Sequence, residues 1–318
     1  MASRPAVTPV KGYYCDSARW NAYVPRPCDI VIATAPKVGT TWTQQIVSLL
    51  VFQSTEPKPL QIISPWLDNC MRDNLAETLA LLEAQTHRRY IKSHLPLSAL
   101  PIHDGVKYIH VARDGRDACM SFLNHINAYT PAVWARLDAV AEADPALASP
   151  APRPPRDVRG FFRHWITPGG TANAEQMGDC FFEIERSFWA QRARDNLLLV
   201  HFNDLKADLD AEMRRIAGFL EIDTPAALWP SLVQAAEFEA MKTAGADLMP
   251  GAEHAFEGGH ATFLNKGVNG RWRDDLTAED LALYQSRVEA ELSPDLAAWL
   301  EHGRRGAGRS AAFGGQAD

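Results

Sequence analysis

The run Ala35-Pro36-Lys37-Val38-Gly39-Thr40-Thr41-Trp42 gathers residue types that bind a phosphate or sulfate group. Lys37 supplies a positive charge, Thr40 and Thr41 supply hydroxyls, and Gly39 lets an anion approach the backbone amides. In the common nucleotide-binding loop the lysine follows the glycine, as Gly-Lys-Ser/Thr, and the hydroxyl residue also holds Mg²⁺. Here the lysine precedes the glycine. The run therefore predicts an anion site of another kind, with a plain strand-to-helix turn and a solvated lysine as the alternative.

The elements around this run would place it at the edge of a sheet. Residues 29–34 are apolar and β-branched, as in a buried parallel strand, and an apolar helix is expected from Trp42 to Phe52, capped by Thr40 or Thr41. Further strands are expected at 89–92, 107–112 and 197–202, and further helices at 71–87, 118–125 and 208–220. This alternation predicts an α/β fold in a single domain, with a central parallel β-sheet flanked by helices.

Composition restricts the kind of protein and its surroundings. The chain has 318 residues, of which 46% are hydrophobic and 22% charged, which is typical of a soluble globular protein. Its net charge of −7 leaves no basic excess for a nucleic-acid backbone, so we expect no nucleic-acid partner. The five cysteines are scattered, and neither a signal-type N-terminus nor a membrane-length apolar run is present. These features predict a cytoplasmic protein without stable membrane insertion.

The chain divides into three parts. Residues 1–27 form an N-terminal segment, 28–300 form the domain, and 301–318 are expected to be a disordered tail. Within the domain, 129–178 and 243–265 are rich in proline or turn-forming residues, so both are expected to be loop excursions. Long loops in a compact domain are often functional, and these two would cover the binding site.

Three later segments agree with the first run. The first is Lys92-Ser93-His94-Leu95-Pro96. The second is a strand that ends at Arg113, with Ser121 eight residues later. The third is Asn265-Lys266-Gly267-Val268-Asn269-Gly270-Arg271-Trp272. In this order the four segments resemble the motifs of the cytosolic type of sulfotransferase, in a bacterial-like variant. That family moves a sulfuryl group from 3′-phosphoadenosine 5′-phosphosulfate (PAPS) to a hydroxyl or amine. The resemblance covers residues 28–280 and also implies the phosphosulfate-binding strand–loop–helix.

The resemblance implies roles for the polar residues. His94 would be the general base, since the unperturbed pKa of histidine suits that task. Lys37 would contact the oxygen that bridges sulfur and the 5′-phosphate, and Lys92 would contact the sulfuryl oxygens. Arg113 and Ser121 would hold the 3′-phosphate. Ser121 is also expected to be catalytic. The residues expected to bind PAPS, or its product PAP, are Lys37, Val38, Gly39, Thr40, Thr41, Trp42, Arg113, Ser121, Phe202, Phe238, Met241, Asn265, Lys266 and Gly267. No metal is expected.

The aromatic residues are less specific. Trp42 and Phe238 are expected to sandwich the adenine, because flat rings accept a base without matched hydrogen bonds. The segments that flank the acceptor in the family contribute Trp66, Tyr129, Phe161, Phe162 and Trp165. They imply a small, largely apolar acceptor, but such aromatics commonly belong to the core. Phenol, sterol, polyketide and glycolipid acceptors all stay open.

Several positions depart from the family pattern. Val38 replaces a serine beside the loop lysine, Phe202 replaces a tyrosine near the adenine, and Asn265 replaces an arginine at the 3′-phosphate. The short C-terminal dimer motif is also incomplete: Thr277 is kept, but Ala278 stands where its valine belongs and Ala282 where its glutamate belongs. We therefore expect a monomer or a weak homodimer.

Two other functions fit the same loop. A phosphotransferase would use ATP and require Mg²⁺, whereas a sulfotransferase would bind PAPS in preference to ATP. A catalytically silent nucleotide-binding protein is the second alternative, although Lys37, Lys92 and His94 are all retained.

Overall fold

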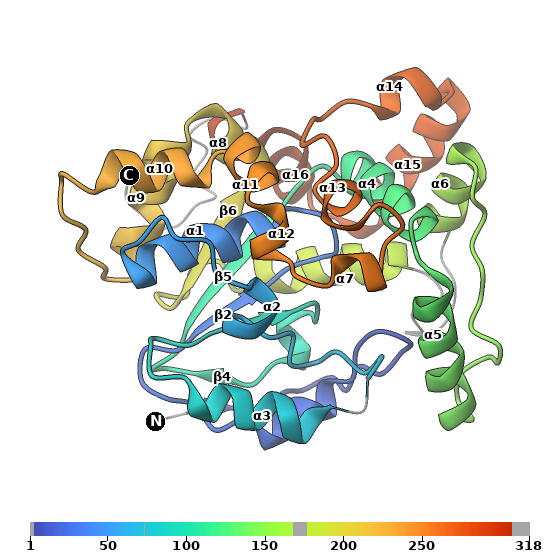
Figure 1. Cartoon of the computed structure of the whole chain (residues 1–318). Coiled ribbons are helices and arrows are strands. Elements are labelled where there is room, and N and C mark those ends of the chain that lie inside the picture. Colours follow the sequence, from blue (N-terminus) through green and yellow to red (C-terminus); the bar gives the residue numbers. More distant parts are fainter. Residues whose placement is uncertain (1–2, 73, 168–176, 307–318) are drawn as a thin grey trace.

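Four parallel strands form the central sheet in the computed structural model, which describes residues 3–72, 74–167 and 177–306 (Figure 1). In sheet order these strands are Tyr90–Ser93 (β3), Ile30–Ala33 (β2), Lys107–Ala112 (β5) and Leu197–His201 (β6). The register pairs Ile32 with Lys92 on one side of β2 and with Ile109 on the other. The predicted α/β class and parallel sheet are confirmed.

Successive residues of each strand face two different cores, because side chains alternate across a sheet. Ile30 and Ile32 of β2 pack with one group of helices, whereas Val31 and Ala33 pack with another. Both faces of the sheet are therefore buried, which explains why most strand residues on both faces are apolar rather than alternating with polar ones. In Figure 1, α1 and α10 lie together on one side of the strands, and α4, α6 and α15 lie together elsewhere.

The helices account for most of the remaining described chain. They are Thr40–Phe52 (α1), Leu60–Ile63 (α2), Leu75–Ala84 (α3), Gly115–Asn127 (α4), Pro131–Ala143 (α5), Val158–Ile166 (α6), Met177–Trp189 (α7), Phe202–Ala207 (α8), Leu209–Phe219 (α9), Trp229–Ala236 (α10), Phe238–Thr243 (α11), Gly245–Leu248 (α12), Gly259–Phe263 (α13), Trp272–Asp275 (α14), Ala278–Glu291 (α15) and Pro294–Gly306 (α16). Short 3₁₀ helices span Ser17–Ala22, Leu97–Ala99 and Ala252–His254. Two short strands, Ser3–Arg4 (β1) and Ile102–His103 (β4), pair antiparallel.

Some expected boundaries were wrong. Helix α1 begins at Thr40 with Gly39 at its N-cap, so neither threonine caps it. The helix expected at 71–87 is limited to Leu75–Ala84. The excursion expected at 129–178 contains α5 and α6, because its prolines stand at the start of α5, where proline is tolerated, and otherwise outside the two helices. Residues 168–176 of that excursion lie outside the described residues.

Residues 301–306, expected to belong to a disordered tail, are helical instead. Helix α16 continues to Gly306, bending at Gly303, whose φ of 75° suits glycine. There the backbone N–H groups of Arg304 and Arg305 donate to the Asp204 carboxylate, at 2.8 and 3.1 Å. Residues 301–306 are therefore tied to α8, and the expected tail from 307 lies outside the described residues.

The sheet order creates a natural binding edge. The chain passes from β2 to its neighbour β3 and then returns across β2 to β5, so the connections leave β2 in opposite directions. Open parallel sheets bind ligands at the carboxyl edge beside such a reversal. Lys37 lies just beyond β2, His94 directly follows β3, and Arg113 directly follows β5.

Candidate active site

One large cavity, about 950 Å³ in volume, opens at the carboxyl edge of the sheet. It brings together most of the residues that the sequence singled out. The predicted residues that line it are Lys37, Gly39, Thr40, Thr41, Trp42, Trp66, Lys92, His94, Arg113, Ser121, Tyr129, Phe202, Phe238, Met241, Asn265, Lys266 and Gly267. Val38, Phe161, Phe162 and Trp165 do not line it.

The loop between β2 and α1 has an unusual backbone that follows from its sequence. Gly39 has a φ of 121°, and a Cβ there would lie 3.2 Å from the Phe202 ring, so only glycine fits without strain. Lys37 also has a positive φ of 68°, uncommon for a side chain of its size. Val38 lies between them with its side chain in the core. The resulting tight turn leads into the N-terminus of α1 at the cavity wall.

Two lysine ammonium groups enter the cavity, Lys37 from the β2–α1 loop and Lys92 from β3. Lys37 Nζ lies 4.2 Å from the centroid of the Phe263 ring, and Lys92 Nζ lies 4.5 Å from that of Trp66. Burial lowers the pKa of Lys37 to about 7, with Lys92 and Arg113 adding repulsion. Burial likewise lowers the pKa of Lys92 to about 8. Neither lysine forms an ion pair with any residue that the structure describes.

His94 is held in one tautomer by the backbone. Its Nδ1 lies 2.8 Å from the carbonyl oxygen of Thr34, which can only accept, so Nδ1 carries the proton and Nε2 keeps its lone pair. The His94 backbone N–H donates to Asp68 Oδ2 at 3.1 Å, and the Trp66 ring packs edge to face on the imidazole at 4.9 Å. Burial, together with Lys92, depresses the pKa of His94 well below its ordinary value. His94 therefore presents a neutral, proton-accepting nitrogen near pH 7.

Arg113 lines the cavity directly after the end of β5. Its guanidinium donates to Asn269 Oδ1 and to the carbonyl oxygen of Val268, and it stacks over the Phe202 ring at 4.1 Å. Among the described residues, Arg113 forms no ion pair with the nearby Asp114 or Asp117, and Asp114 pairs with Arg116. Burial lowers the pKa of Arg113 to about 10, although Asp117 and Asp114 oppose this shift. Arg113 thus joins the strand edge to the loop that carries the last sequence motif.

The aromatic residues near the predicted adenine site form two separate contacts, Trp42 with Phe202 and Phe238 with Gly267. Trp42 donates from Nε1 to the carbonyl oxygen of Ala236 at 2.8 Å and meets Phe202 edge to face at 5.4 Å. Phe238 packs against Gly267, where a Cβ would lie only 2.8 Å from the ring and where φ is 62°. Glycine at 267 is therefore required both by its backbone conformation and by the adjacent ring. The adenine sandwich between Trp42 and Phe238 stays a prediction.

The remaining wall of the cavity is mixed in character. Tyr129 and Phe256 contribute rings, with centroids 5.9 Å apart, and Trp66 stands beside His94. Polar side chains from the segment before α3, from α3 itself and from α5 also line it: Asn69, Arg72, Asn74, Glu77 and Arg136. Neither Arg72 nor Arg136 forms an ion pair within the described part of the chain. The wall therefore has an apolar part and a polar part.

Three predicted acceptor residues are displaced from this wall. Phe161 and Phe162 are 2% and 0% exposed on α6, and Trp165 packs on Phe181 and Phe182. Helix α6 turns its aromatic face to α4, α7 and α15, so these rings belong to the core. The structure does not bring these three rings to the cavity wall, because composition cannot tell which neighbour an amphipathic helix will meet.

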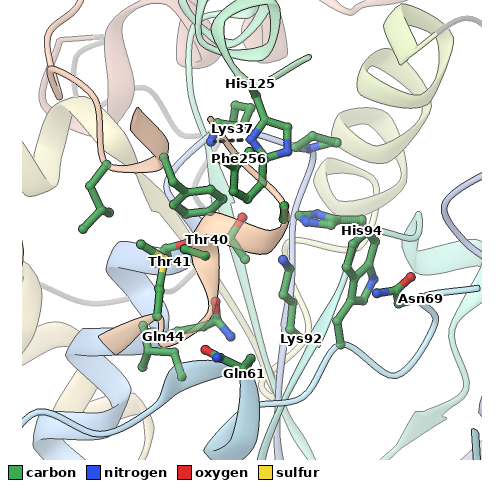
Figure 2. Close-up of a pocket in the computed structure, with 18 of the residues that line it drawn as sticks. Lys37, Thr40, Thr41, Gln44, Gln61, Asn69, Lys92, His94, His125 and Phe256 are labelled. Carbon is green, nitrogen blue, oxygen red and sulfur yellow. Dashed lines mark hydrogen bonds between the residues drawn. The ribbon is translucent and has the colours of Figure 1, made fainter. Parts of the chain in front are cut away.

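His125, which none of the sequence motifs includes, lies in the cavity beside Lys37. Figure 2 shows Lys37, Lys92, His94 and His125 turned toward the same space. His125 follows Ser121 by one turn of α4, and the i, i+4 spacing on a helix could have placed both on the same face. Phe256 and Phe263 were also missed, since neither belongs to a recognisable motif.

No group of three or more His, Cys, Asp or Glu side chains in residues 3–72, 74–167 and 177–306 is arranged to hold a metal ion. In the same ranges no helix is both long and apolar enough to cross a bilayer.

Comparisons with known proteins agree with this geometry. A sulfotransferase domain model matches residues 27–294. A glycolipid sulfotransferase of Mycobacterium bovis is 34% identical over 308 residues, covering 92% of this chain and 93% of the relative. A cytosolic sulfotransferase of Danio rerio is 25% identical over 264 residues, covering 79% and 78% of the two chains.

Solved structures resemble the fold. Retinol dehydratase in complex with androsterone and the inactive cofactor PAP superposes with a TM-score of 0.65 at 23% identity, covering 86% of this chain and 83% of that one. A mouse sulfotransferase complexed with PAP gives a TM-score of 0.64 at 18% identity, covering 89% and 92%.

Proposed function

This chain belongs to the sulfotransferase family, and from that premise we propose that it transfers a sulfuryl group from PAPS to a hydroxyl or amine of an amphiphilic acceptor. The observation that carries the proposal is the pair of cavity ammonium groups of Lys37 and Lys92. Both have lowered pKa values because they are buried, and neither has a carboxylate partner among the described residues. Buried cations that lack a counter-charge favour an anionic ligand between them.

The side chains present fit such a donor. The β2–α1 loop and Lys37 suit the 5′-phosphosulfate, since backbone amides and an ammonium converge there. Arg113, Ser121 and Lys266 line the same cavity and suit a second phosphate. Phe238, which lines the cavity beside Gly267, suits a flat base nearby.

The chemistry needs a proton acceptor and a cation at the leaving oxygen. His94 Nε2 takes the proton of the acceptor hydroxyl as its oxygen forms a bond to sulfur. The bond between sulfur and the 5′-phosphate oxygen breaks, and PAP departs with that oxygen. Lys37 stabilises the negative charge that develops on this oxygen, and Lys92 stabilises the sulfuryl oxygens. His94, Lys37 and Lys92 all line the cavity at the carboxyl edge of the sheet, so they could act on the same transferring group.

The cavity wall favours an amphiphilic acceptor. Rings of Trp66, Tyr129 and Phe256 suit an apolar part, and the polar side chains that include Arg72 and Arg136 suit hydroxyl groups. The relatives at 34% identity are named glycolipid sulfotransferases, which supports a glycolipid as the first acceptor to test. This wall is more polar than the aromatic residues of the sequence alone suggested.

Calorimetry with PAP, ATP and AMP, followed by transfer from labelled PAPS to octyl glucoside, tests the proposal. We expect PAP to bind more tightly than ATP, and labelled sulfate to appear on the glucoside without added Mg²⁺. Preference for ATP together with a Mg²⁺ requirement would favour a phosphotransferase. Tight PAP binding without transfer to any hydroxylated amphiphile would favour a silent nucleotide-binding protein.

We further propose a cytoplasmic enzyme that needs no metal and is a monomer or weak homodimer. The five free cysteines and the cytosolic relative support the location. Thr277, part of the incomplete dimer motif, caps α15 in a capping box with Asp280, so its hydroxyl is used within the chain. Light scattering of the purified protein tests the oligomeric state.

A further inference from the structure

His125 contacts the loop lysine directly. Its Nδ1 lies 3.4 Å from Lys37 Nζ, across 88 residues of sequence, and Figure 2 marks this interaction with a dashed line. An ammonium can only donate, so Nδ1 is the acceptor and the imidazole proton sits on Nε2. The tautomer is therefore the reverse of that in His94, where Nδ1 carries the proton.

The ring of His125 is fixed by aromatic neighbours. It lies 4.7 Å from Phe256, 5.1 Å from Tyr129 and 5.5 Å from Phe263, centroid to centroid. Phe263 also lies under the Lys37 ammonium, at 4.2 Å. Lys37 is thus held on two sides, by the nitrogen of His125 and by the face of Phe263.

The surroundings keep this imidazole neutral. The charged or titratable groups that face it are Lys37 from the β2–α1 loop, Lys92 and His94 from β3 and its end, and Tyr129 beyond α4. Burial and the positive charge of the two lysines lower the pKa of His125 well below its ordinary value. A neutral ring can accept from Lys37 throughout the range in which the enzyme would work.

The second nitrogen of His125 is available to a ligand. No residue of the described chain hydrogen-bonds Nε2, and this atom is not among the enclosed polar atoms that lack a partner. His125 lines the cavity together with His94. Its Nε2–H therefore offers a donor in a wall otherwise made largely of rings.

We propose that His125 is a positioning and specificity residue that links Lys37 to the acceptor. Its Nδ1 sets the place of the Lys37 ammonium, and its Nε2–H donates to an oxygen of the acceptor other than the one being sulfated. The two histidines then act in complementary ways: His94 removes a proton, and His125 recognises a neighbouring oxygen. An acceptor with adjacent oxygens, such as a sugar headgroup, satisfies both. This inference rests on the proposed sulfuryl transfer.

Three substitutions separate the two nitrogens. His125→Asn places an amide oxygen near Nδ1 and removes the donor at Nε2. His125→Gln places an amide near Nε2 and removes the acceptor at Nδ1. His125→Phe keeps the flat ring and removes both nitrogens, and His302→Phe, an exposed site on α16 outside the cavity, is the matched control.

The first measurement follows the Lys37 pKa by NMR of protein labelled at the lysine ε-carbons, without donor or acceptor. His125→Phe and His125→Gln are expected to lower that pKa by about one unit, because a hydrogen bond to the charged form is lost. His125→Asn and His302→Phe are expected to leave it within about half a unit of the parent value. An unchanged Lys37 titration in His125→Phe would overturn the positioning role. This readout needs no sulfuryl transfer, so it stands even if the proposed function fails.

The second measurement is steady-state transfer from PAPS to octyl glucoside. His125→Phe should lower kcat about 10–100-fold, and His125→Asn should recover most of it, since positioning depends on the acceptor atom near Nδ1. His125→Asn should instead raise the KM for octyl glucoside about 5–20-fold, the effect of one hydrogen bond. Equal losses of kcat in His125→Asn and His125→Phe would contradict positioning, and an unchanged KM in His125→Asn would contradict acceptor recognition.

Discussion

The Arg113 guanidinium donates to Asn269 Oδ1 from Nε at 3.0 Å and from NH2 at 2.7 Å, across 156 residues of sequence. Asn269 in turn donates to Asn203 Oδ1, and the adjacent Gly270 N–H donates to Asp117 Oδ1. The loop that carries the last motif is therefore tied to the ends of β5 and β6. A single arginine both places this loop and faces the nucleotide cavity.

Arg113→Ala is expected to weaken PAP binding about 10–100-fold, because charge-assisted contacts to a phosphate are strong. AMP, which lacks the 3′-phosphate, should lose much less. Calorimetry with both nucleotides measures the difference. Asn269→Ala is the control: it releases the loop but keeps the guanidinium, so it should affect both nucleotides alike and weakly. Equal losses for PAP and AMP in Arg113→Ala would mean that Arg113 only supports the loop.

His94→Ala should reduce single-turnover transfer about 10²–10⁴-fold while PAP affinity stays unchanged, as loss of a general base predicts. His94 Nδ1 bonds to Thr34 rather than to the cavity, so nucleotide binding does not depend on it. His94→Gln keeps an amide near Nε2 and should remain nearly as slow, because an amide cannot take the proton. A fast chemical step in His94→Ala would contradict the role.

The dependence of kcat/KM on pH should reflect the titration of the Lys37 ammonium. Its pKa is lowered to about 7 in the donor-free protein, so kcat/KM for PAPS should fall as the pH rises through that value and the ammonium is lost. With donor bound, the added negative charge raises that pKa, and kcat should hold to higher pH. Because the pKa of His94 is depressed, the acid limb should lie below the ordinary histidine range. Lys37→Arg, which stays charged, should move the alkaline limb up toward the Lys92 pKa of about 8, at a reduced rate.

The Asp68 carboxylate helps to position His94 by accepting a hydrogen bond from its backbone. It is fully buried, and its carboxylate accepts from the His94 backbone N–H, from Trp66 Nε1 and from Trp20 Nε1. Asp68→Asn turns an amide donor toward one of these donors and should destabilise the fold by about 1–3 kcal/mol. Urea denaturation measures this loss. Retained stability together with retained activity would mean that the three donors find other acceptors.

Phe161→Ala and Phe256→Ala distinguish core from acceptor wall. Phe161 is 2% exposed, so its loss should cost about 3–5 kcal/mol of stability and leave the KM for octyl glucoside unchanged in the folded fraction. Phe256 lines the cavity, so its loss should raise that KM with a smaller cost in stability. A raised KM in Phe161→Ala with little loss of stability, together with an unchanged KM in Phe256→Ala, would mean that α6 contributes to the acceptor site.

The sequence by itself determined the local units that carry the anion site. The strands β2, β3, β5 and β6 were predictable from short apolar runs, and the Lys37 loop from the order of lysine, glycine and threonine. Parallel strands present their carboxyl ends at one edge, so the convergence of Lys37, His94 and Arg113 followed from the strand order along the chain. These features depend on backbone periodicity and turn chemistry, which neighbouring residues set.

The tertiary structure decided the contacts between distant segments. Whether the rings of α6 face the acceptor or the core depends on how α6 packs against α4, α7 and α15, and its composition is the same in both cases. The meeting of His125 with Lys37 depends on how α4 leaves the sheet, and that of Arg113 with Asn269 on where a late loop returns. Such contacts are set by side-chain packing between elements far apart in sequence, which no local pattern encodes.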